Sequence, residues 1–231
     1  MSYIRENFIE TQEKINKALV RAKRDEGGTR LITVTKTVDT KRIKEAIDAG
    51  AKILGENRVQ EILEKYDELS PIAEFHLIGH LQKNKVKYII GKVSLIHSVE
   101  SLDLVKEIDK RAKQADLVQR ILIEVNVSGE ESKFGLRPDE VLDFVKSASE
   151  YENVKIEGLM TVAPFDADEN ELRDVFKGLR KLADTVRECN IKNVSMDELS
   201  MGMTNDFELA IEEGATMVRV GTGIFGERNY K

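Results

Sequence analysis

Residues 31–57, LITVTKTVDTKRIKEAIDAGAKILGEN, contain the repeating unit from which the rest of the chain is built. The unit begins with a short run of apolar and β-branched residues, LITVT, and ends with a second apolar run, KILGEN. Between these runs, Asp39 stands before a segment with helical character and Gly50 follows it, as a helix cap and a helix stop would. A strand, a helix and a strand joined this closely predict parallel strands covered by the helix.

The same alternation of short apolar runs and charged, helix-like segments continues to the end of the chain. Pro138 at a helix start and Gly214 at a helix end mark later segments in the same way. The apolar runs number eight: LITVT, KILGEN, EFHLIGH, SLIHSV, QRILIEVNV, KIEGLMTV, MDELSMG and TMVRVG. Strand and helix are therefore expected to alternate throughout.

Eight β/α units predict a single (β/α)₈ barrel of the TIM type, spanning residues 1–231 as one domain. A doubly wound open sheet is the alternative, but the count of eight favours the barrel. An extra helix is predicted before the first strand, over residues 4–24. Its apolar residues recur at roughly helical intervals: Ile4, Phe8, Ile15 and Leu19.

Composition excludes several classes of protein. The net charge is −6, from 36 basic and 42 acidic residues, so no chain-wide basic field exists to hold nucleic acid or an acidic membrane surface. The N-terminal residues lack the apolar core of a signal peptide, and no later run approaches a membrane span. The single cysteine, Cys189, cannot form an internal disulfide, which agrees with a reducing compartment. We therefore expect a cytoplasmic globular protein without nucleic-acid or membrane partners.

Polar groups gather at the carboxyl ends of the predicted strands, where barrel enzymes bind their ligands. Lys36 ends the first strand and Asn57 follows the second. Met160 closes the sixth strand, and Ser200 begins the segment SMGMTND, which we expect to form the loop after the seventh. These strand ends are the candidates for a binding site.

The two loops expected after the seventh and eighth strands are rich in small residues. SMGMTND follows the seventh strand, and GTGIFG, which begins with Gly221 and Thr222, follows the eighth. Small residues let backbone N–H groups approach an anion, and these two positions often form the phosphate site of a barrel. One such turn is more often an ordinary connection, whereas two at these positions favour a phosphate site.

A lysine facing a phosphate site across a barrel mouth is typical of Schiff-base chemistry with a phosphorylated carbonyl compound. A single lysine at the start of a loop is more often solvated than reactive, so Lys36 alone does not indicate a site. Its combination with the two loops favours Schiff-base chemistry. Arg219 lies between Val218 and Val220, inside the eighth strand, where a permanent charge needs a partner. That partner is either a carboxylate in a structural ion pair or, for pyridoxal phosphate (PLP), the ring nitrogen.

Two other signals are read as structural. His76 and His80 in HLIGH are four residues apart, but this spacing straddles a predicted strand end, so no metal site is expected. The basic segment QKNKVKYIIGK is more typical of a solvated helix face than of a surface that binds an anion or a partner.

Several long motifs, in the same order along the chain, closely resemble the family of pyridoxal phosphate homeostasis proteins. These motifs are VTKTV, GENRVQE, HLIGHLQKNK, GLMTVAP and SMGMTNDFELAIEEGATMVRVGTGIFGER. Members of this family are similar to the barrel domain of alanine racemase standing alone. The resemblance extends from the leading helix to Arg228.

The resemblance implies a role for each candidate residue. Lys36 would hold PLP as an internal aldimine, and Arg219 would face the ring nitrogen. The phosphate would be held by Ser200, Gly221 and Thr222. The resemblance places further residues beside the cofactor or in its phosphate loop: Asn57, Met160, Met201, Gly202 and Met203.

The resemblance implies a carrier that binds, buffers and delivers PLP, with PLP-dependent apoenzymes as possible recipients. The chain ends soon after the eighth strand, so we expect no second domain to supply the second acid/base group that racemisation needs. The same missing domain favours a monomer. One alternative is a PLP-dependent racemase. Another is a Schiff-base aldolase that acts on a phosphorylated sugar, but this alternative gives Arg219 no role.

Overall fold

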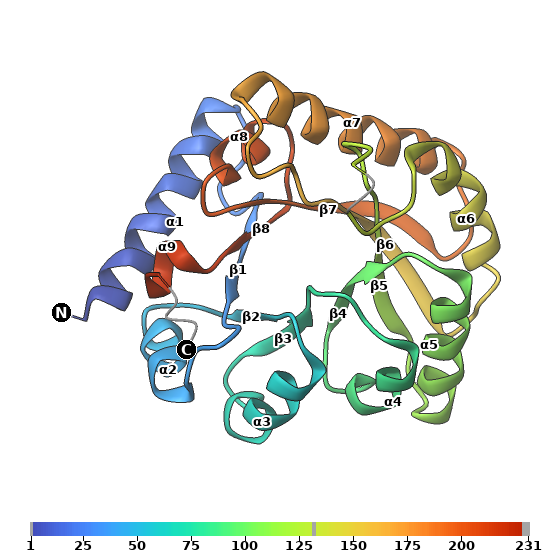
Figure 1. Ribbon diagram of the computed structural model, residues 1–231, viewed down its shortest axis with the longest axis horizontal. Helices are drawn as coiled ribbons and strands as arrows, with labels where there is room; N and C mark the ends of the chain where they lie inside the picture. The colour runs from blue at the N-terminus through green and yellow to red at the C-terminus, as the bar shows by residue number, and fades with distance from the viewer. Residues whose placement is uncertain (1, 131–132, 228–231) are drawn as a thin grey trace.

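The computed structural model describes residues 2–130 and 133–227, and it contains a closed barrel of eight parallel strands. The strands follow one another around the barrel in chain order, and the helices cover its outside (Figure 1). The predicted (β/α)₈ barrel is thus confirmed, and the open sheet is wrong because β1 and β8 pair directly. Arg228, in the last family motif, lies outside the described residues.

The eight strands coincide with the eight predicted apolar runs. Their bounds are β1 Arg30–Val34, β2 Ile53–Glu56, β3 Glu74–Leu77, β4 Leu95–Val99, β5 Gln119–Glu124, β6 Val154–Met160, β7 Val194–Met203 and β8 Met217–Val220. The α-helices are α1 Tyr3–Arg21, α2 Thr40–Asp48, α3 Val59–Leu69, α4 Val86–Ile89, α5 Leu102–Gln114, α6 Val141–Ala148, α7 Glu169–Glu188, α8 Phe207–Glu212 and α9 Thr222–Phe225. Two 3₁₀ turns, Lys83–Lys85 and Pro138–Glu140, precede α4 and α6.

The barrel has two separate apolar layers. A small inner cluster fills part of the lumen and includes Ile32, Leu122 and Met160. A much larger cluster lies between the strands and the surrounding helices. Because successive strand residues face opposite sides of the sheet, both layers are supplied by the same nearly continuous apolar runs.

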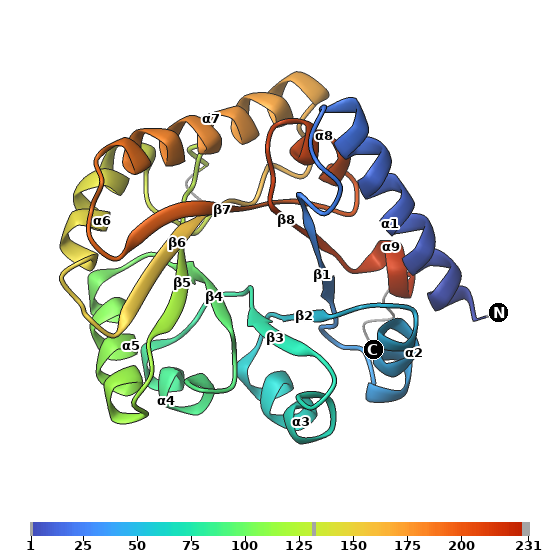
Figure 2. The ribbon, with the colours of Figure 1, turned by 180° about the vertical axis from the view of Figure 1, so that it is seen from behind.

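The leading helix α1 lies along α8 and α9 on the outside of the barrel (Figure 1, Figure 2). Its first turn is capped by the Ser2 hydroxyl, which accepts from the N–H of Ile4. The Asn7 side chain donates to the Ile224 carbonyl at 3.1 Å, and the Tyr3 hydroxyl donates to the Phe225 carbonyl at 3.3 Å. The leading helix therefore holds the short helix α9, which stands at the mouth of the barrel.

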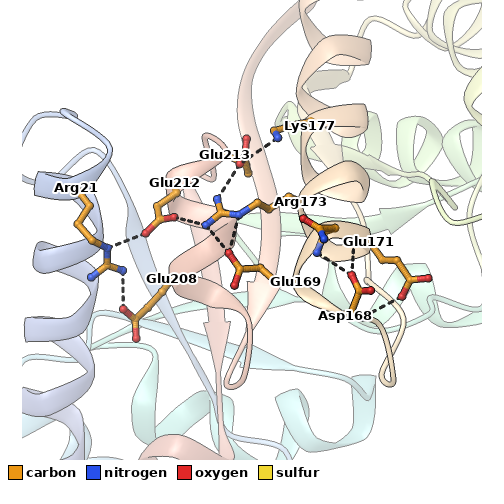
Figure 3. A network of polar contacts seen from close by, with 10 residues as sticks. Arg21, Asp168, Glu169, Glu171, Arg173, Lys177, Glu208, Glu212 and Glu213 are labelled. Carbon is orange, nitrogen blue, oxygen red and sulfur yellow. Dashed lines mark hydrogen bonds and ion pairs between the residues drawn. The ribbon is translucent and has the colours of Figure 1, made fainter.

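An ion-pair network joins α1, α7 and α8 on one side of the barrel (Figure 3). Arg173 of α7 binds Glu212 at 2.7 Å and Glu213 at 2.9 Å. Arg21 of α1 binds Glu212 and Glu208, each at 2.7 Å. Single surface pairs stabilise little, but a network of shared carboxylates fixes helix positions more firmly.

The ends of two strands differ from the prediction. The predicted strand run MDELSMG and the predicted loop SMGMTND overlap at Ser200, Met201 and Gly202. Because β7 continues through Met203, these three residues lie inside the strand and their assignment to a loop is wrong. This extension is stabilised by pairing of Met203 with Arg219 of β8. The segment after β8 is not an open turn either, since Gly221 caps the short helix α9. Among the described residues, no helix has the length and apolar character needed to cross a membrane.

Candidate cofactor site

The barrel closure brings the predicted site residues to one mouth. Strand β1 lies between β2 and β8, with Val34 in register with Gly55 and Thr33 in register with Val220. The segments that follow these strands therefore emerge side by side at the carboxyl end. They carry Lys36, Asn57 and Gly221, although the chain separates them widely.

Lys36 lies two residues beyond the end of β1 and not at its last residue. The chain turns here, with Thr37 in the left-handed region at a φ of 61°. Lys36 is partly buried.

Asn57 directly follows β2 and has a buried polar atom with an open bonding position. Its Oδ1 has no hydrogen-bond partner among the described residues. A Cβ on Gly79 would lie 2.5 Å from the Asn57 carbonyl oxygen, so a glycine is needed for the loop after β3 to pack here. The unpaired amide oxygen at a barrel mouth is typical of a site that binds a ligand.

Thr204, a residue that we did not single out from the sequence, contacts the predicted phosphate segment after β8. The Thr204 hydroxyl lies 3.1 Å from the Thr222 hydroxyl, and the N–H of Gly223 donates to it at 3.4 Å. Two hydroxyls thus stand at the start of α9, where helical N–H groups lack intrahelical partners. Thr204 lies within SMGMTND, so its place in that motif was the only signal in the sequence.

Gly202 and the two methionines have different surroundings. Gly202 has a φ of +90°, and a Cβ there would lie 2.5 Å from Cβ of Ala210 in α8. This glycine is therefore required for α8 to pack against β7. Met160 belongs to the inner cluster of the lumen, whereas Met201 packs in the outer layer among helix residues.

A chain of four buried polar side chains crosses the upper lumen. Nη1 of Arg219 donates to Oγ of Ser200 at 2.6 Å, and Nη2 donates to the Thr161 carbonyl at 2.8 Å. Oγ of Ser200 lies 2.9 Å from Nδ1 of His97, and Nε2 of His97 lies 3.0 Å from Nδ1 of His76. Residues from β3, β4, β7 and β8 are linked in this way.

Burial keeps both histidines neutral. It lowers the pKa of His76 to about 3 and that of His97 well below its usual value. Since Arg219 donates to the Ser200 hydroxyl, the hydroxyl proton is directed to Nδ1 of His97, the acceptor within reach. His97 then carries its proton on Nε2 and donates to His76. Nε2 of His76 has no partner among the described residues.

Arg219 is a buried cation with neutral acceptors. Burial lowers its pKa to about 10, although Asp206 and Glu124 act to raise it, so it stays protonated at neutral pH. In the described part of the chain, no carboxylate lies within ion-pair distance of its guanidinium, so the structural ion pair considered above is not formed. Its two observed hydrogen bonds leave other N–H groups for a ligand.

Glu124, at the end of β5, is a second buried ionisable group that the sequence analysis missed. Burial, with a contribution from Glu100, raises its pKa to about 7. It aligns with Met160, which in turn aligns with Ser200 across β6 and β7. Glu124 also lines a cavity of about 180 Å³ beside Lys133. No periodicity in the sequence distinguishes this glutamate from the other acidic residues at strand ends.

His76 and His80 of HLIGH do not share a site. His76 is buried against His97, whereas His80 lies near the surface, 3.3 Å from Glu100, and stacks on Phe134. Within the described ranges, no cluster of three or more His, Cys, Asp or Glu side chains has a geometry suited to a metal ion.

The family comparison covers nearly the whole chain. Residues 11–229 match the model of the alanine racemase N-terminal domain. The pyridoxal phosphate homeostasis protein of Aquifex aeolicus is 47% identical over 226 residues, covering 97% of this chain and 98% of that protein. The human protein of the same name is 37% identical over 234 residues, covering 94% of this chain and 84% of that protein.

Solved structures agree with this likeness. PipY of Synechococcus elongatus, in a structure with PLP bound, has a TM-score of 0.80 at 32% identity and covers 92% of this chain and all (100%) of that one. Alanine racemase of Clostridium difficile has a TM-score of 0.78 at 14% identity, covering 98% of this chain and 58% of that one, which supports the fold alone.

Proposed function

This chain belongs to the pyridoxal phosphate homeostasis protein family, and we propose that it binds PLP through a Schiff base on Lys36 and serves to buffer and deliver the cofactor. The proteins of Aquifex aeolicus and human named above are called pyridoxal phosphate homeostasis proteins, and PipY has been solved with PLP bound. We also infer that residues 1–231 form one domain, and that the protein is a cytoplasmic monomer that transfers PLP to apoenzymes.

The observation that carries the proposal is the state of Arg219. A buried guanidinium with neutral acceptors and spare N–H groups fits an unprotonated pyridine nitrogen, which accepts a hydrogen bond and adds no second positive charge. The hydroxyls of Thr204 and Thr222 at the start of α9 fit a phosphate. PLP would supply an aldehyde for Lys36 and an electron sink.

The remaining predicted residues take supporting places in this proposal. Asn57 offers an unpaired amide oxygen at the mouth, and Met160 stands in the lumen. Ser200 is proposed to act through Arg219, because its hydroxyl is already bonded on both sides. The segments of Met201, Gly202, Gly221 and Thr222 are proposed to shape the phosphate end, with Met201 contributing its backbone alone.

Arg219 would tune bound PLP against most carbanion chemistry. An arginine does not protonate the pyridine nitrogen, so the bound ring is a weaker electron sink and carbanion chemistry is disfavoured. The second candidate is a racemase-type enzyme, which one observation favours. Glu124 has a pKa of about 7 at the same mouth, suited to moving a proton near neutral pH.

The test is visible absorption of the purified protein after addition of PLP. Wild type should form the absorption band of a lysine Schiff base, and borohydride should fix one cofactor mass to the peptide that contains Lys36. Lys36→Ala should lose both signals, while Lys87→Ala, at an exposed position, should keep them. A full band in Lys36→Ala would overturn the assignment, and measured racemisation of alanine by wild type would favour the enzyme.

A further inference from the structure

The two residues that flank Lys36 are both held by groups from β2 and α3. Thr35 donates its hydroxyl to Oε1 of Glu56 at 2.6 Å, and its carbonyl accepts from Lys65 at 2.9 Å. On the other side, the N–H of Thr37 donates to Oε2 of Glu61 at 2.6 Å. The backbone of Lys36 is therefore bound immediately before and immediately after its own residue.

Lys65 joins these contacts into one cluster. Its ammonium donates to the Thr35 carbonyl, to Oε1 of Glu56 at 2.7 Å and to Oε2 of Glu61 at 3.1 Å. An ammonium has three N–H donors, so all of them are used inside the cluster. Lys65 is buried and has no donor left for a ligand. We call Lys65, Glu56 and Glu61 the Lys65 clamp.

Stability alone does not account for the Lys65 clamp. Burial raises the pKa of Glu56 despite the nearby Lys65, and its Oε2 has no partner in the described part of the chain. Buried ion pairs are often no more stabilising than apolar residues of similar size, because both charges lose their hydration. A cluster that leaves a buried carboxylate oxygen unpaired fits a geometric role better.

The geometry that the clamp maintains is unusual. Thr37 is β-branched and has a φ of 61°, a left-handed conformation that such residues rarely adopt. A conformation of this kind persists where surrounding contacts impose it. The bond from Thr37 to Glu61 is a contact of this type, and it turns the chain directly after Lys36.

We propose that the Lys65 clamp positions Lys36, by fixing the backbone on both sides so that its amine reaches the lumen at one place and angle. This inference rests on the proposed Schiff base at Lys36. Lys65, Glu56 and Glu61 act through Lys36 and touch neither cofactor nor substrate. Loss of the clamp should slow Schiff-base formation even in a protein that folds normally.

Two variants at Glu61 separate position from charge. Glu61→Gln keeps an oxygen that can accept from Thr37, whereas Glu61→Leu has a similar size and no acceptor. In stopped-flow absorption after PLP addition, Glu61→Leu should form the visible band about 10-fold more slowly than wild type, and Glu61→Gln should stay within about 3-fold. Equal rates for wild type and Glu61→Leu would overturn the inference.

The double variant Lys65→Met/Glu56→Gln guards against a folding defect. It removes both buried charges together, so urea unfolding should stay close to wild type while band formation slows by about 10-fold. The control Lys44→Met/Glu68→Gln removes an exposed lysine–glutamate pair that joins α2 to α3, with N and O 2.7 Å apart, and should leave the rate unchanged. A wild-type rate in a folded Lys65→Met/Glu56→Gln protein would overturn the clamp.

The result for wild type distinguishes failure of the proposed Schiff base from failure of the positioning role. If wild type forms neither the band nor a borohydride adduct, the proposed Schiff base on Lys36 is wrong, and the positioning role falls with it. If wild type forms both and the clamp variants match its rate, only the positioning role is wrong.

Discussion

The hydroxyl of Ser200 lies 2.6 Å from Nη1 of Arg219, on the strand next to it in the barrel. The same hydroxyl lies 2.9 Å from His97, so it both accepts a hydrogen bond from the cation and passes one on to a neutral imidazole. Ser200 thereby fixes the plane of the Arg219 guanidinium, which we propose to donate to the ring nitrogen of PLP. Its side chain is fully buried and its two bonds are already made.

Ser200→Ala should lower the free energy of unfolding by about 2–4 kcal/mol, because it leaves Arg219 and His97 each with one unpaired buried polar atom. Urea unfolding followed by circular dichroism measures this loss. Ser147→Ala, at an exposed hydroxyl on α6, is the control and should change stability by less than about 0.5 kcal/mol. An equally small loss for Ser200→Ala would contradict the buried chain.

Substitutions at the start of α9 should separate hydroxyl from backbone contributions to PLP retention. Thr222→Ala removes one charge-assisted hydrogen bond and should weaken retention by about 10- to 100-fold. Gly221→Leu should weaken it far more, because a bulky side chain at this buried position displaces several backbone donors together. Equilibrium dialysis gives both constants, with circular dichroism as the folding check. If Gly221→Leu retains PLP as tightly as wild type, the phosphate does not bind at the start of α9.

The pKa of Glu124 makes stability depend on pH in a defined direction. The folded pKa is about 7 and the usual value is 4.5, so the folded state binds more protons between these values and stability falls as pH rises through this window. Glu124→Gln removes this dependence. It should stabilise the protein by about 1–3 kcal/mol at pH 8 and leave it nearly unchanged at pH 4. The exposed variant Glu130→Gln should show no such difference between the two pH values.

Gly158 of β6 packs directly on the next strand. A Cβ at this position would lie 1.8 Å from the carbonyl oxygen of Glu198, at the register shift between β6 and β7. Gly158→Ala should therefore destabilise the protein by more than about 4 kcal/mol or prevent folding. Gly91 has a positive φ of +78°, but an added Cβ would have its nearest neighbour 3.6 Å away. Gly91→Ala should therefore lower the free energy of unfolding by only about 1 kcal/mol. Thermal unfolding of the two variants side by side provides the comparison.

The sequence by itself was sufficient for the order and kind of the elements. All eight predicted apolar runs form strands. The predicted helix start at Asp39 is correct, since its side chain caps α2, and so are the predicted helix ends at Gly50 and Gly214, which have φ values of 119° and 111°. These features depend on neighbours a few residues away, so periodicity and capping chemistry reveal them. The same reasoning located Lys36 near a strand end and Arg219 inside a strand.

Only the tertiary structure decided what surrounds those two residues. His97 and Ser200 are 103 residues apart and meet because the barrel closes, and Lys65 of α3 reaches the Thr35 carbonyl because β2, on which α3 packs, pairs with β1. Ser200 was expected in a loop because SMGMTND is rich in small residues. It lies in β7 because pairing with β8 and the lumen contacts of its hydroxyl outweigh this local preference. Such contacts join distant parts of the chain, and no local pattern encodes them.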